Sequence, residues 1–132
     1  MSLKIIVVED NFIIQMFLEE VAQNMGHEVL VSTDNGEDLL GLLDTMVPDV
    51  ILLDIGITGK HSGIEIAEIL NVKYKVPFVF VTGNSDHSTI KRAKDSSPLH
   101  IIHKPIDEEQ LEEELETIEH KLSASKHLEK HR

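Results

Sequence analysis

The chain has 132 residues, of which 41% are apolar and none is cysteine, and 24 acidic against 12 basic side chains give a formal net charge of −12. This size and apolar content predict one domain with a single core, and no stretch approaches the roughly 20 apolar residues of a membrane span. The absence of cysteine excludes disulfides and thiolate metal sites. Because no signal peptide is evident either, we expect a cytoplasmic protein. The acidic balance disfavours direct binding to nucleic acid or to an anionic membrane.

Strand-like and helix-like segments alternate along the whole chain. Short apolar, β-branched runs bounded by turn residues predict strands at about 3–8, 28–32, 49–53, 77–81 and 99–103. Cap residues and helical spacing predict helices at about 11–24, 36–45, 63–72 and 86–94, and from near Asp107 almost to the C-terminus. Five such units predict an α/β fold, the flavodoxin-like doubly wound (βα)5 arrangement with a parallel sheet in the order 2-1-3-4-5.

Four of the predicted strands end on residues that phosphoryl-transfer chemistry can use: Glu9-Asp10, Asp54, Thr82 and Lys104-Pro105. Ligands of an open parallel sheet bind outside the carboxyl ends of its strands, so these side chains are expected on one rim. Taken singly, each has an ordinary explanation, such as a helix cap, a strand end, a turn or a solvated lysine. Together they predict a site for a divalent metal and a phosphoryl group.

In this order and at these separations, the same residues resemble the receiver domain of two-component response regulators over about residues 3–122. The resemblance implies that Asp54 accepts the phosphoryl group, and that Glu9, Asp10, Asp54 and the backbone carbonyl of Gly56 hold Mg²⁺, which Mn²⁺ can replace. It implies that Lys104 pairs with a phosphoryl oxygen, that the Thr82 hydroxyl binds another and reports the phosphorylated state, and that the Lys104-Pro105 peptide is cis.

The resemblance also implies partners. The expected phosphodonor is a sensor histidine kinase or a histidine phosphotransfer protein. The chain would promote its own phosphorylation and dephosphorylation without being a turnover enzyme. A weak homodimer through the face between the fourth and fifth helices is a further expectation.

Several positions depart from the usual receiver pattern. Thr58 stands where the family usually has proline, and the loop to Gly63 is one residue longer than its commonest form. Gly56 and Asn84 occupy the positions whose side chains tune dephosphorylation, and Gly56 has no side chain for that purpose. Ile101 replaces the usual aromatic switch residue. We therefore expect Thr82, Ile101 and the segment 84–87 with the fourth helix to carry a modified conformational switch.

The first helix offers two apolar faces. Helical spacing predicts that one set faces the core, namely Ile14, Phe17, Leu18, Val21 and Met25. The remaining Phe12, Ile13 and Met16 are expected to form an exposed docking patch beside the active rim, with Pro105 as a further contact. The alternative is that a tilted helix buries all of them.

The C-terminal helix outlasts the predicted domain. Leu111, Leu115, Ile118 and Leu122 suffice to cover the sheet, yet 123–132 contains neither glycine nor proline. This segment is expected to be a helical extension that acts as a linker, or else a frayed tail, and the short seam disfavours a strong coiled coil.

Two other functions compete with a phosphorylated receiver. One is a degenerate receiver that binds proteins independently of phosphorylation. The other is a haloacid-dehalogenase-type phosphatase, which also uses an aspartyl phosphate. The phosphatase reading is weakened because Gly56 stands where its acid/base aspartate belongs.

Overall fold

The computed structural model describes residues 2–83 and 86–130, with side chains through Ser125. Five parallel strands form one sheet in the order β2-β1-β3-β4-β5, which confirms the predicted topology. The strands are β1 (Lys4–Val8), β2 (Glu28–Thr33), β3 (Val50–Asp54), β4 (Phe78–Thr82) and β5 (His100–His103). This order makes β1 and β3 neighbours, and it puts Val8 in register with Leu53.

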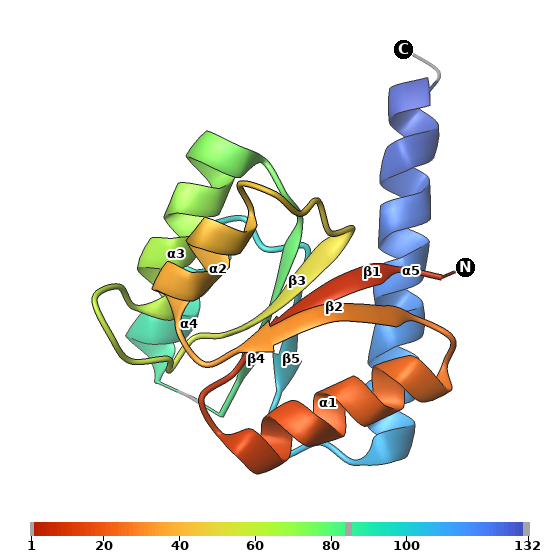
Figure 1. Cartoon of the computed structure of the whole chain (residues 1–132), viewed down its shortest axis with the longest axis horizontal. Helices are drawn as coiled ribbons and strands as arrows, with labels where there is room; N and C mark the ends of the chain where they lie inside the picture. The colour runs from red at the N-terminus through yellow and green to blue at the C-terminus, as the bar shows by residue number, and fades with distance from the viewer. Residues whose placement is uncertain (1, 84–85, 131–132) are drawn as a thin grey trace.

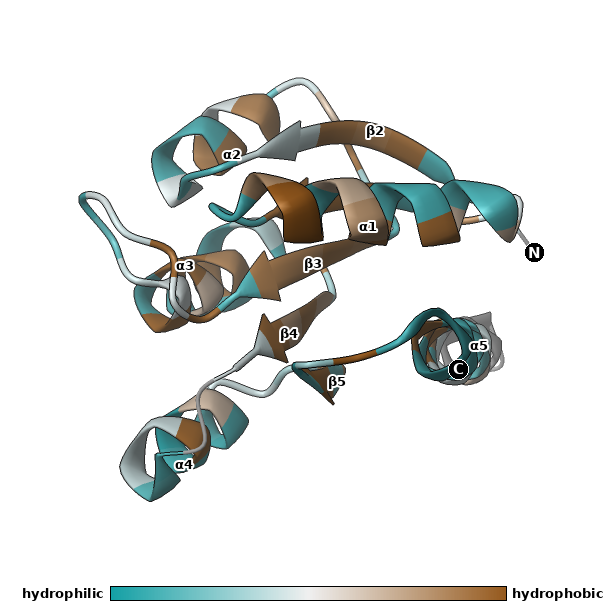
Figure 2. Cartoon of the chain, turned by 90° about the horizontal axis from the view of Figure 1, so that it is seen from below, coloured by the Kyte–Doolittle hydropathy of each residue, from teal (hydrophilic) through white to brown (hydrophobic). Residues whose placement is uncertain are grey.

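Helices connect the strands and lie on both faces of the sheet (Figures 1 and 2). They are α1 (Phe12–Asn24), α2 (Gly36–Leu42), α3 (Gly63–Ile69) with a π-helical turn η1 (Leu70–Tyr74), α4 (His87–Asp95) and α5 (Glu108–Lys130). Asn11 caps α1 as predicted, because its side-chain oxygen accepts from the N–H groups of Ile13 and Ile14.

Two helix ends differ from the prediction. Helix α2 stops at Leu42 and not at Thr45, because the N–H and hydroxyl groups of Thr45 both donate to the Leu42 carbonyl and close a turn. Helix α3 does not simply end near residue 72 but widens into η1. There the Lys75 N–H donates back to the Leu70 carbonyl, with Lys75 in the left-handed region at φ 54°. A glycine would ordinarily mark such a position, and none is present.

The sheet separates two apolar cores (Figure 2). Alternate residues of β1 face opposite layers, with Ile5 and Val7 on one side and Ile6 and Val8 on the other. The first layer is completed by α1 and α5, and the second by α2, α3 and α4. The core residues predicted in α1 are confirmed, since Leu18 and Val21 are buried and Ile14, Phe17 and Met25 pack against them partly buried.

Helix α5 is held along its inner side. Among the side chains described in this helix, the buried ones are those predicted, Leu111, Leu115, Ile118 and Leu122. The helix continues to Lys130, beyond the body of the sheet (Figure 1), and the role of residues 123–132 as a linker stays a prediction.

Polar contacts also fasten α5. Buried His27, the residue before β2, accepts from the Leu3 N–H through Nδ1 at 3.0 Å, and its Nε2 lies 3.2 Å from Glu119 Oε1. On β5, His100 lies between Glu114 and Lys121 of α5, at 2.6 and 2.9 Å.

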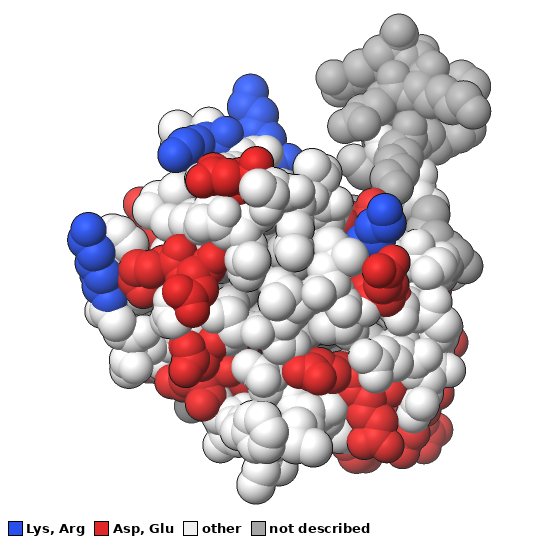
Figure 3. All heavy atoms as spheres, in the orientation of Figure 1, with Lys and Arg blue, Asp and Glu red and all other residues white. Residues whose placement is uncertain are grey.

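Among the charged side chains, acidic groups outnumber basic ones, 24 to 12. On the face shown in Figure 3, red patches of Asp and Glu are spread widely, whereas Lys and Arg are few. Within the described residues, no helix is both long and apolar enough to cross a membrane.

Candidate functional site

The predicted carboxylates meet at the carboxyl edge of the sheet. Glu9 and Asp10 follow β1, and Asp54 is the last residue of β3, so the pairing of these two strands brings them together. One oxygen from each of Glu9, Asp10 and Asp54 can be chosen so that all three lie within 4.8 Å of one another. Hard oxygen ligands, with room for water on the exposed Asp10 side, fit Mg²⁺.

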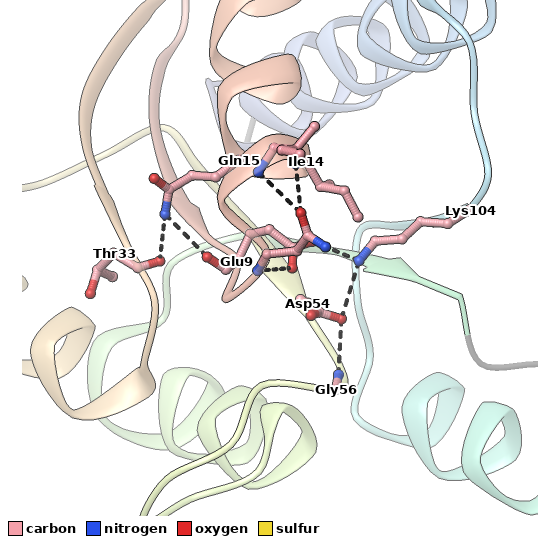
Figure 4. A network of polar contacts seen from close by, with 9 residues as sticks. Glu9, Ile14, Gln15, Thr33, Asp54, Gly56 and Lys104 are labelled. Carbon is pink, nitrogen blue, oxygen red and sulfur yellow. Dashed lines mark hydrogen bonds and ion pairs between the residues drawn. The ribbon is translucent and has the colours of Figure 1, made fainter.

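Lys104 supplies the positive charge of this site (Figure 4). Its Nζ lies 2.6 Å from Glu9 Oε1 and 3.7 Å from Asp54 Oδ1. Glu9 is only 1% exposed and Asp54 7%, so two nearly buried carboxylates share one ammonium group. The Lys104 N–H donates to the Thr82 carbonyl at 2.8 Å, which ties the start of this side chain to the end of β4.

Backbone N–H groups orient both buried carboxylates. Gly56 N–H donates to Asp54 Oδ1 at 2.9 Å, and Asn11 N–H donates to Glu9 Oε2 at 3.1 Å. Each carboxylate is therefore bound by a backbone donor on its own loop as well as by Lys104. The predicted role of the Gly56 carbonyl as a metal ligand stays a prediction.

The predicted switch residues lie on β4 and β5, the two strands that follow β3 in the sheet. Thr82 ends β4 and is buried, at 1% exposure. Ile101 is half-buried on β5 and packs on the layer that contains α4. The Lys104-Pro105 peptide is cis, as the resemblance implied. Asn84 and Ser85 of the expected switch segment lie outside the described residues.

The start of α1 presents the expected apolar patch. Phe12, Ile13 and Met16 are 68%, 77% and 51% exposed, which rules out the alternative that a tilted helix buries them.

Two grooves are lined in part by residues of α1. One is acidic and contains Asp10, Asp34 and Asp38 as well as Phe12. The other is mainly apolar and joins α1 to the β5–α5 loop, with Ile14 and Phe17 opposite Pro105 and Ile106. Pro105 thus lies near α1, and its place in a shared docking surface stays a prediction.

Two contacts at the site were not predicted from the sequence. The side chain of Gln15 donates to the backbone carbonyls of Glu9 and Thr33 (Figure 4). The sequence does mark Gln15 as unusual, because it is the only polar residue in the run from Phe12 to Leu18.

The second contact holds the long loop after Asp54. Glu37 on α2 accepts from the His61 N–H at 2.9 Å, on a loop where Thr58 replaces the usual proline. At the end of this loop, a Cβ on Gly63 would lie 2.5 Å from the Asp54 carbonyl oxygen, so the close packing of α3 on β3 requires glycine.

Comparison with known proteins identifies the family. The model of the response regulator receiver domain matches residues 5–116, and the chain belongs to this family. The family is a signalling module and not a turnover enzyme, which decides against the phosphatase alternative. Receiver domains bind Mg²⁺ through an acidic cluster of this kind, and their phosphodonors are partners such as histidine kinases.

Relatives of known sequence are longer than this chain. Transcriptional regulatory protein PdtaR of Mycobacterium tuberculosis is 26% identical over 102 residues, which cover 77% of this chain and 49% of PdtaR. A protein-glutamate methylesterase/protein-glutamine glutaminase of Paramagnetospirillum magneticum is 27% identical over 109 residues, covering 80% of this chain and 31% of the relative. The chain thus spans half or less of the length of these relatives.

Solved receiver structures share the fold. The signal receiver domain of a modulated diguanylate cyclase from Desulfovibrio desulfuricans has a TM-score of 0.84 at 29% identity, over 95% of this chain and 99% of that one. The chemotaxis response regulator CheY4 of Vibrio cholerae has a TM-score of 0.78 at 22% identity, over 89% of this chain and 99% of that one.

Proposed function

We propose that this receiver accepts a phosphoryl group on Asp54 in a Mg²⁺-dependent reaction, donated by a sensor histidine kinase or a histidine phosphotransfer protein. The observation that carries the proposal is the meeting of Glu9, Asp10 and Asp54 with Lys104 on one rim. A chain that had lost phosphotransfer would have no need to keep all four charged groups together.

Asp54 acts as the nucleophile. The Gly56 N–H bond and the Lys104 contact both fall on Oδ1, and we assign Oδ2 as the attacking oxygen. A new O–P bond forms on the aspartate as the P–N bond of the donor phosphohistidine breaks, and the electron pair of that bond leaves with the imidazole nitrogen. Hydrogen bonding of Oδ1 fixes the plane of the carboxylate and so the direction of attack.

Charge around Asp54 decides whether a phosphate can approach. Bound Mg²⁺ would be held by Glu9, Asp10, Asp54 and the Gly56 carbonyl, and it would add two positive charges to that of Lys104, which alone does not balance three carboxylates. The Lys104 ammonium group, which pairs with Glu9 here, would pair with a phosphoryl oxygen instead. Thr82 would donate its hydroxyl to another, and Ile101 would adjust its packing as the loop after β4 moves.

The Phe12, Ile13 and Met16 patch is the proposed docking surface for the donor, together with Pro105. Acidic groups of the neighbouring groove lie on its border. A donor with an apolar helical surface bordered by Lys or Arg would complement it. A weak homodimer through the face between α4 and α5 stays a separate proposal, tested by sedimentation.

The assignment of Asp54 is tested by intact mass after incubation with acetyl phosphate or phosphoramidate. We expect a gain of one phosphoryl mass that requires Mg²⁺, is blocked by chelator and is lost in Asp54→Asn. Asp44→Asn, at an exposed aspartate, is the matched control. A mass gain that persists in Asp54→Asn would refute the assignment. No gain in the wild type would favour the degenerate receiver.

Docking and switching are tested separately. Phe12→Ala and Met16→Ala should slow transfer from a phosphorylated partner and leave small-donor phosphorylation intact, with Val47→Ala as a control because Val47 is exposed elsewhere. Equal loss with both donors would contradict the docking role.

On addition of a phosphate mimic, NMR shift changes should cluster at 82–104, and changes confined to the metal ligands would contradict the proposed switch.

A further inference from the structure

The side-chain amide of Gln15 joins the ends of two strands. From the first turns of α1, its Nε2 donates to the Glu9 carbonyl at 3.1 Å and to the Thr33 carbonyl at 3.3 Å (Figure 4). Glu9 is the first residue after β1, and Thr33 is the last residue of β2. Gln15 therefore contacts the backbone at the point where the β1–β2 ladder ends.

The chemistry of the two contacts fixes which way the amide points. Both partners are carbonyl oxygens, which only accept hydrogen bonds, so the NH2 group and not the oxygen of Gln15 must face them. The Thr33 carbonyl also accepts from the Glu9 N–H at 3.0 Å. The two donors of the Gln15 amide thus extend the pairing of β1 and β2 beyond its last register pair, Val8 with Thr33.

What Gln15 holds is the backbone that carries two of the three carboxylates. The next residue after Glu9 is Asp10, and the Asn11 N–H closes the turn by donating to Glu9 Oε2. Both hydrogen bonds given for the Gln15 side chain end on backbone carbonyls, and neither ends on a carboxylate of the cluster. Its effect on the site therefore acts through the backbone of Glu9.

We propose that Gln15 is a positioning residue that holds the Glu9-Asp10 turn in the geometry required for metal binding. Without its two donors, the Glu9 carbonyl loses its side-chain partner and the turn gains conformational freedom, which metal binding must then remove. The metal part of this inference rests on the proposed function, whereas the effect on the turn does not.

The test replaces Gln15 by Met, which has similar length and helix propensity but no donor. Gln23→Met, on the same helix at an exposed position, is the matched control. The first measurement is amide hydrogen exchange in the metal-free protein. We expect the Glu9 and Asn11 amides to exchange about two- to tenfold faster in Gln15→Met, with the amides of β3 and β4 unchanged.

The second measurement is Mn²⁺ binding, followed by the loss of the free-ion signal in electron paramagnetic resonance. The dissociation constant should rise about two- to tenfold in Gln15→Met and stay unchanged in Gln23→Met. Small-donor phosphorylation should then need more metal for half-maximal rate but recover the wild-type rate at saturation. Loss of a residue that only supports the fold would not raise the metal concentration for half-maximal rate while leaving the rate at saturating metal unchanged.

Three results would overturn the inference: unchanged local exchange, uniformly faster exchange across the sheet, or unchanged Mn²⁺ affinity in Gln15→Met. Failure of the wild type to bind Mn²⁺ or Mg²⁺ would instead refute the proposed function, and the exchange measurement would still decide whether Gln15 holds the turn.

Discussion

Replacement of Lys104 by Met should destabilise the metal-free protein strongly and the metal-bound protein much less. Lys104 Nζ is 2.6 Å from Glu9 Oε1 and 3.7 Å from Asp54 Oδ1, and both carboxylates are nearly buried. With an effective dielectric constant of about 20, the shorter pair corresponds to about 6 kcal/mol of Coulomb attraction before desolvation is subtracted. Breaking a buried pair from one side costs about 3–5 kcal/mol, because the remaining charge has no counter-ion.

For a domain of this size, such a loss lowers the thermal midpoint by about 10–20 °C. Mg²⁺ brings two positive charges to the same carboxylates and should restore most of that loss. The measurement is thermal unfolding by circular dichroism, with chelator and with saturating Mg²⁺, for the wild type, Lys104→Met and the exposed control Lys91→Met. We expect the Mg²⁺-induced rise in midpoint to be largest in Lys104→Met.

The reasoning would be refuted if metal-free Lys104→Met unfolded at the wild-type temperature, since Glu9 would then not depend on the lysine. It would also be refuted if Mg²⁺ raised the midpoints of all three proteins equally, because the ion would not be replacing the lost charge.

Three further predictions concern regions around the site. Glu37→Ala should speed hydrogen exchange of the His61 amide, because that N–H loses its acceptor. Glu37→Gln keeps an acceptor and should leave this exchange rate unchanged. Equal exchange rates in the two variants would show that the Glu37 side chain does not hold the loop. Burial lowers the pKa of His27 against an opposing effect of Glu119. Its contribution to stability is thus present above about pH 6.5 and lost as the pH falls through the lowered pKa. Urea unfolding at pH 7.5 and 5.5 should show a smaller difference in His27→Gln than in the wild type. Leu122 is the last buried side chain described in α5. Truncation after this residue should change the free energy of unfolding by no more than about 0.5 kcal/mol. A larger loss of stability would show that the extension has a structural role.

Much of the site could be predicted because it follows from strand ends. The runs before Asp10 and Asp54 are apolar and β-branched, so their burial as parallel strands, and the convergence of the residues that follow, need only local sequence and topology. The exposure of Phe12 could be predicted in the same way, because helical spacing separates it from the core residues.

Other contacts could not be predicted because they join a side chain to the backbone of a remote segment. Gln15 binds the Thr33 carbonyl, and Glu37 binds the His61 N–H, and neither partner carries a side-chain signal that identifies it. The π-helical turn was missed for a similar reason, since Lys75 adopts a left-handed conformation that the sequence would normally mark with glycine or asparagine.

The extension of α5 past its last described core contact has a mechanical consequence. Leu122 is the last buried side chain among those that the structure describes in this helix, while the helix runs on to Lys130. Measured from Leu122, the arm to Lys130 is about 12 Å long at 1.5 Å per residue, so a tilt of about 10° would move its tip by about 2 Å. A rigid helix fixed at one end acts as a lever. A rearrangement too small to disturb the core on which the helix rests can thus become, at the far end, a displacement longer than a covalent bond.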